Sequence, residues 1–139
     1  PKGVLYYGSP SAKNYNFGST AGTARSPKMK VPAGSAKLQF SVYSATESGT
    51  KYDKLAVFLY VNGIKVNVQS ASAPAAGSIW YKGQSGATTN KWHTIQTDVS
   101  KYAGSDVQLE FYFVTGDSVS NSTAGVFVDD VQLIGTCPK

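Results

Sequence analysis

The stretch from Leu55 to Val68 reads Leu-Ala-Val-Phe-Leu-Tyr-Val-Asn-Gly-Ile-Lys-Val-Asn-Val, and it decides the fold. Apolar residues alternate along both of its halves with the period of two that is typical of a half-buried β-strand. Asn62-Gly63 separates the halves and suits a type I′ turn, because both central residues of that turn need a positive φ. The stretch therefore predicts two antiparallel strands joined by a tight hairpin turn.

The same alternation recurs along the rest of the chain, and the helical period is found nowhere. Further strands are predicted at residues 4–7, 23–28, 38–42, 78–82, 92–97, 107–114 and 125–134. The run from Asp98 to Gly104 is long enough for one helical turn, capped by Asp98 and closed by Gly104. About nine short strands without intervening helices predict a β-sandwich that occupies residues 1–139 as a single domain.

Composition excludes several classes of protein. The hydrophobic fraction of 41% is too high for a disordered chain, and no apolar run approaches the ~20 residues of a membrane-spanning helix. The chain has one His (His93) and one Cys (Cys137), so it cannot build a zinc site from these residue types alone. Because no nucleophile-base constellation is recognisable, we expect no catalytic residue. Any disulfide partner of Cys137 would have to lie outside this chain. We expect the chain to be a piece of a larger secreted protein.

Three consecutive segments resemble a known family. They are Trp92-His-Thr-Ile-Gln-Thr-Asp-Val-Ser-Lys-Tyr-Ala-Gly104, Val107-Gln-Leu-Glu-Phe-Tyr-Phe-Val-Thr115 and Gly125-Val-Phe-Val-Asp-Asp-Val-Gln-Leu133. Together they are similar to the closing half of the MAM-like jelly-roll domains. Val99 stands where the family usually has Leu, and the paired cysteines of the animal members are missing. The bacterial branch of the family is therefore the nearer likeness.

The resemblance implies a jelly roll of two antiparallel sheets with an accessory role. Bacterial relatives sit beside the catalytic domains of secreted proteases of the immune inhibitor A type, and in cleaved adhesins. The implied function is a non-catalytic, secreted or cell-surface domain that contacts the catalytic domain of its parent and binds a protein or polysaccharide ligand. Two alternatives stay open, because fold alone does not name a ligand: a carbohydrate-binding module of a glycan-active enzyme, and an adhesin or surface repeat.

Asp129 is the main candidate for a metal ligand. Strict alternation would set it on one face with Phe127, Val131 and Leu133, and a carboxylate buried there needs hydrogen bonds or a cation. Ca²⁺ suits oxygen ligands of this kind, and Asp130, Glu47 and Asp53 are the further carboxylates that a structural calcium ion could use. In the alternative, Asp129 accepts backbone N–H groups, or a bulge turns it outward while Asp130 faces inward.

Aromatic residues are the other candidates for a binding site. Trp80 and Tyr81 follow a loop of small residues and are predicted to contact a sugar or peptide ligand. Trp92 is expected to pack in the core, which would leave its neighbour His93 exposed, since adjacent strand residues point to opposite faces. The Tyr6-Tyr7 pair is expected to pack as part of a strand.

The net charge of +5 leaves two interpretations of the basic residues. Arg25, Lys28, Lys30 and Lys37 concentrate in the first third of the chain and could favour an anionic polymer. Equally, lysines on edge strands discourage aggregation. With one Arg and no basic-aromatic cluster, sequence-specific nucleic-acid binding is not expected.

Overall fold

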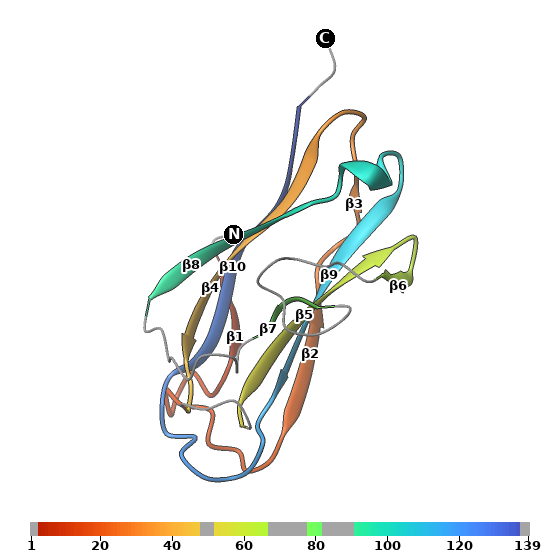
Figure 1. Ribbon diagram of the computed structural model, residues 1–139. Helices are drawn as coiled ribbons and strands as arrows, with labels where there is room; N and C mark the ends of the chain where they lie inside the picture. Colours follow the sequence, from red (N-terminus) through yellow and green to blue (C-terminus); the bar gives the residue numbers. More distant parts are fainter. Residues whose placement is uncertain (1–2, 48–51, 67–77, 82–90, 137–139) are drawn as a thin grey trace.

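The computed structural model describes residues 3–47, 52–66, 78–81 and 91–136. Residues 78–81 are described by their backbone alone. Two antiparallel sheets lie face to face (Figure 1). The first sheet has the order β1-β10-β4-β8, with the bounds β1 Leu5–Tyr7, β10 Gly125–Gly135, β4 Ala36–Ala45 and β8 Trp92–Asp98. We call it the four-stranded sheet.

The second sheet has the order β2-β9-β5-β6, and two further strands pair with its members. Its strands are β2 Ala21–Arg25, β9 Asp106–Val114, β5 Lys54–Val61, β6 Ile64–Val66, β3 Met29–Lys30 beside β9, and β7 Ser78–Tyr81 beside β5. Strands that follow one another in sequence often lie in opposite sheets, and this interleaved order is that of a jelly roll. The predicted β-sandwich is confirmed, and so is the jelly-roll arrangement.

The hydrophobic core lies between the two sheets. Leu38, Phe40 and Val42 of β4 face inward and are almost completely buried, as the alternation predicts. Phe40 meets Phe111 of β9 edge to face with ring centroids 5.3 Å apart, so an aromatic contact links the sheets at their centre.

The two turns predicted from the sequence are present. Asn62 and Gly63 have φ angles of 49° and 84° and connect β5 to β6, as the hairpin prediction requires. Ser100–Tyr102 form a single 3₁₀ turn, and the backbone N–H of Ser100 donates to Oδ1 of Asp98 at 2.8 Å. The N-cap of the turn is Val99, however, and the predicted cap Asp98 contacts the turn from one residue before it. Gly104, with a φ of 79°, directly follows the C-cap residue Ala103.

Candidate functional site

Four aromatic side chains form a row across the outer face of the four-stranded sheet. Tyr6 of β1 stands opposite Phe127 of β10, Phe127 opposite Tyr43 of β4, and Tyr43 opposite Trp92 of β8. Neighbouring ring centroids in this aromatic row lie 4.3, 5.8 and 5.8 Å apart. One signal in the sequence indicated the row. Tyr43 directly follows the inward-facing Val42, so alternation along the strand places Tyr43 on the outer face.

Trp92 is the member of the row with the most open ring. Tyr6 and Phe127 are stacked on each other with their planes 9° apart, so each covers a face of the other. The Tyr43 ring lies at 52° to that of Trp92 and supports it from one side, while 51% of Trp92 stays exposed. The expectation that Trp92 packs in the core is wrong, and His93 is the neighbour that turns inward, opposite Val42.

A hollow of about 250 Å³ adjoins Trp92 and is lined by Ser41, Asp129 and Asp130. The hydroxyl of Ser41 donates to Oδ2 of Asp130 at 3.4 Å, and the backbone N–H of Asp130 donates to Oδ1 of Asp129 at 2.8 Å. Both carboxylates are exposed, so the hollow offers several acceptor oxygens beside an open indole ring.

The position of Asp129 corrects the sequence-based expectation that it lies in an apolar stripe. Asp129 pairs with Ser41, but Gln132 pairs with Gln39, so β10 holds one more residue than β4 in this interval. Asp130 is that extra residue, and its φ of 52° is the left-handed conformation of a bulge. Phe127 and Asp129 therefore face outward, whereas Val131 and Leu133 after the bulge pack against the core.

The four carboxylates named as metal ligands fall into two separate groups. Asp129 and Asp130 both lie on the outer face. The alternative with a bulge was therefore right that Asp129 faces outward and wrong that Asp130 faces inward. Glu47 and Asp53 lie together where β4 ends and β5 begins, and the Glu47 N–H donates to Oδ2 of Asp53 at 3.3 Å. Within the described ranges, no three Asp, Glu, His or Cys side chains gather as a metal site would require.

The structure describes the other predicted ligand-binding residues, Trp80 and Tyr81, only by their backbone. Trp80 and Tyr81 belong to β7, and their side chains lie outside the described part of the structure, as does Cys137. Their predicted role stays a prediction.

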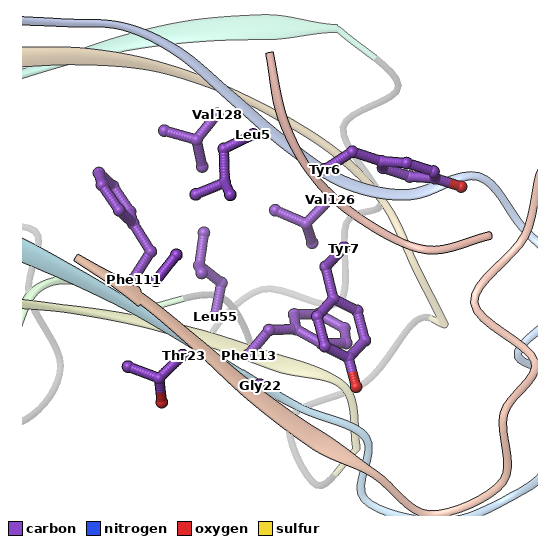
Figure 2. Close-up of a pocket in the computed structure, with 11 residues that line it drawn as sticks. Leu5, Tyr6, Tyr7, Gly22, Thr23, Leu55, Phe111, Phe113, Val126 and Val128 are labelled. Atoms are coloured by element: carbon purple, nitrogen blue, oxygen red, sulfur yellow. The ribbon is translucent and has the colours of Figure 1, made fainter. Parts of the chain in front are cut away.

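A second concavity opens between the two sheets (Figure 2). This crevice of about 170 Å³ lies where the edge strands β1 and β2 face each other, and its lining is mainly apolar. Figure 2 shows Leu5, Val126 and Val128 of one sheet opposite Leu55 and Phe111 of the other. The crevice therefore suits an apolar group and has few side chains that could hydrogen-bond a ligand.

The basic residues of the first third do not form one free patch. Arg25 donates to Oε2 of Glu110 at 2.5 Å and lies 4.1 Å from the centroid of the Tyr60 ring. Lys30 pairs with Asp106 at 3.1 Å. Glu110, with 7% of its surface exposed, also pairs with Lys65 at 3.5 Å, so the second sheet neutralises part of its own charge.

No family model and no curated protein matches this chain. Among solved structures, a carbohydrate-binding module, TmCBM61 in complex with β-1,4-galactotriose, is similar to it with a TM-score of 0.49 and 16% identity. The alignment covers 96% of this chain and 81% of that chain. The MAM-like resemblance thus rests on the sequence motifs alone. In the described ranges, no helix has the length and apolar character needed to cross a membrane.

Proposed function

We propose that this domain is a non-catalytic carbohydrate-binding module whose ligand stacks on Trp92. A single observation carries the proposal: a half-exposed indole ring stands beside a hollow lined by one hydroxyl and two carboxylates. A sugar ring has an apolar face of C–H groups and a rim of hydroxyl groups. The indole ring can stack on the C–H face, and the acceptor oxygens can accept hydrogen bonds from the hydroxyl groups.

The rest of the aromatic row fixes the orientation of Trp92. Tyr43 packs against its ring, and the stacked pair of Tyr6 and Phe127 holds Tyr43 from the other side. A ring that is already held loses little conformational entropy when a ligand binds. Adjacent strands lie about 4.8 Å apart, so the row extends for about 14 Å and suits an oligosaccharide rather than a single sugar.

The charge of the hollow supports a preference for neutral glycans. Asp129 and Asp130 both accept hydrogen bonds from hydroxyl groups, but they repel the carboxylate of a uronic acid. This preference differs from the anionic polymer that the basic residues suggested. Because Arg25 and Lys30 have acidic partners, they support an anionic ligand less well.

Attachment to a catalytic domain and a secreted or cell-surface location stay predictions from the family resemblance. An accessory domain of a protease and a carbohydrate-binding module differ in their ligand, which makes ligand binding the decisive measurement.

Affinity electrophoresis with soluble polysaccharides tests the proposal. We expect at least one neutral polysaccharide, from a panel of galactan, xylan, mannan and mixed-linkage glucan, to retard the domain, and polygalacturonate not to. Trp92→Ala should abolish the retardation. Phe17→Ala is the matched control, because Phe17 is also 51% exposed but lies outside the row. Equal retardation of Trp92→Ala and the parent would refute the proposal, as would a panel without any binder.

A double variant tests the polar half of the site. Replacing both Asp129 and Asp130 by Asn removes the two charges but keeps side chains of nearly the same size. Because hydrogen bonds to charged groups contribute about 1.5–3 kcal/mol, we expect affinity for the neutral ligand to fall by about 10- to 100-fold. Isothermal titration calorimetry measures this loss. An unchanged affinity would show that the carboxylates do not contact the sugar.

A further inference from the structure

One edge of the second sheet ends in β2. This strand is the last in the order β2-β9-β5-β6, and no described strand pairs with its other side. Ser26, directly after β2, donates its N–H to the Leu109 carbonyl of β9 at 2.8 Å, so the even-numbered residues of this segment hydrogen-bond to β9. Antiparallel pairing alternates, so the backbone groups of Ala21, Thr23 and Arg25 point to the open edge. Such groups are a template on which a further strand can pair.

The crevice between the two sheets runs beside this open edge (Figure 2). Tyr7 closes one end of it, because a Cβ on Gly22 would lie 2.6 Å from the Tyr7 ring, and the Tyr7 hydroxyl hydrogen-bonds that of Thr20 at 2.6 Å. Two residues further along β2, Ala24 has only a methyl group with which to reach the opposite sheet. Leu5 of that sheet, which also lines the crevice, stays 42% exposed. The crevice is therefore open beside Ala24.

The volume of the crevice matches one large apolar side chain. It measures about 170 Å³, and a cavity of about 150 Å³ lined by similar residues can take up benzene. Val126 and Val128 of one sheet and Leu55 and Phe111 of the other form its walls (Figure 2). A leucine or phenylalanine side chain placed there would leave water and contact both sheets.

We propose that a partner protein adds an extended segment to the open edge of β2 and places one side chain of leucine or phenylalanine size in the crevice. Cross-strand neighbours point to the same face of a sheet, so the partner residue opposite Ala24 would point inward, as Ala24 does. The edge then supplies main-chain hydrogen bonds, and the crevice supplies side-chain specificity. A lipid or a small aromatic compound would fill the crevice but leave the edge unpaired.

Charge favours an acidic partner segment. Arg25, Lys28 and Lys30 are exposed and lie in or between β2 and β3, which both pair with β9. Lys28 has no ion pair among the described residues, and the whole chain carries a net charge of +5. A segment with acidic residues beside its apolar residue would therefore be attracted to this edge, and added salt would slow its association.

A second copy of the same chain fits this edge less well than a foreign segment does. If two copies paired through β2, the inward residues that each brought to the other would be Gly22 and Ala24, which are too small to fill the crevice. An edge of five residues also buries much less than the roughly 1,000 Å² expected of a stable interface. The contact is therefore of the size that suits a peptide segment.

The peptide site is independent of the proposed sugar site. Trp92, which carries the sugar site, belongs to β8, at the edge of the four-stranded sheet opposite to β1. Either proposal can therefore fail without the other.

Nuclear magnetic resonance titration with synthetic peptides tests the proposal. The peptides share the pattern Glu-Thr-X-Thr-Glu, in which X is Leu, Phe or Ala, and are added to millimolar concentration. With Leu or Phe at X, we expect saturable shifts in the amide signals of Ala21, Thr23 and Arg25. With Ala at X, the affinity should be about 10- to 50-fold lower, because fewer apolar atoms are buried. This comparison uses the unmodified domain, so it does not depend on the folding of a variant.

Two variants separate the crevice from the edge. Ala24→Leu fills the crevice, so the Leu and Ala peptides should bind it equally weakly. Thr23→Pro removes an N–H that points to the open edge and takes no hydrogen bond from β9, so every peptide should bind at least about tenfold more weakly. Thr94→Pro is the matched control on β8 and should bind like the parent. Its N–H also points away from the neighbouring strand, since the Val99 N–H donates to the Ala36 carbonyl.

Three results would overturn the proposal. The first is the absence of saturable shifts in millimolar peptide, which is expected if the lysines of this edge only prevent aggregation. The second is equal affinity of the Leu and Ala peptides for the parent, which would show that no side chain enters the crevice. The third is a set of shifts that arises without peptide as the protein concentration rises, which would indicate pairing with a second copy.

Discussion

Glu110 is the residue at which charge and burial meet on the second sheet. Burial alone would raise its pKa, but hydrogen bonds from Arg25 and Tyr60 and the charge of Lys65 outweigh burial, so the pKa lies below its ordinary value. The folded state therefore binds fewer protons at Glu110 than the unfolded state does. The resulting stability is present above the unfolded pKa, near 4.3, and is lost as the pH falls through the lower, folded pKa.

The variant Glu110→Gln tests this dependence. We expect it to lower the free energy of unfolding by about 1–2 kcal/mol at pH 7, because the ion pair with Arg25 is lost. The difference from the parent should shrink as the pH falls below about 4, where the parent also loses its charge. Urea unfolding at several pH values measures both curves, and a difference that stays constant with pH would rule out the carboxylate charge as its source.

Single residues were also where sequence reasoning was least complete. Alternation requires Trp92 and His93 to face opposite ways, but both are large rings with a polar atom, and nothing local decides which is buried. The partners across the strand decide it, since Tyr43 offers Trp92 a contact and Val42 faces the core. The burial of Asp53 likewise depends on Tyr15, which is distant in sequence.

At the scale of elements, prediction succeeded where local chemistry is decisive. The hairpin of β5 and β6 follows from Asn62-Gly63, because the two residues tolerate the positive φ that the turn imposes. The bulge in β10 was predicted only as an alternative, because Asp130 carries no signal as strong as that of Asn62-Gly63. One inserted residue reverses the facing of every residue after it, so Val131 and Leu133 were grouped with Asp129 by mistake.

The hairpin turn offers a direct test of the cost of a positive φ. A Cβ on Gly63 would meet no atom within 4 Å, so the strain in Gly63→Ala comes only from the φ of 84°. We expect a loss of about 1 kcal/mol in the free energy of unfolding. Gly3→Ala is the control, because Gly3 has equally open surroundings without a positive φ. If urea unfolding gave equal stabilities for the two variants, the turn would not be under the constraint described.

For the whole molecule, the two concavities distinguish two ways in which a sandwich can bind a ligand. The outer face of the four-stranded sheet combines an open ring with acceptor oxygens, whereas the crevice between β1 and β2 is mainly apolar. The crevice exists because the sheets meet incompletely at these short edge strands, and Leu5 in its wall stays 42% exposed. Incomplete closure of this kind leaves core residues without partners and costs stability.

Filling the crevice should therefore stabilise the domain without affecting its binding of the polysaccharide. Ala24 lines the crevice opposite Phe111 of the neighbouring strand, and Ala24→Leu adds apolar atoms there. We expect a gain of about 1 kcal/mol, or about 3–5 °C in melting temperature, with Ala24→Val as the smaller change should Leu overfill the space. Calorimetric unfolding measures the gain, and affinity electrophoresis should show polysaccharide binding equal to that of the parent, since Trp92 lies on the other side of the four-stranded sheet. A stabilised Ala24→Leu variant that no longer binds the polysaccharide would contradict the assignment of the site to Trp92 and would locate the ligand in the crevice.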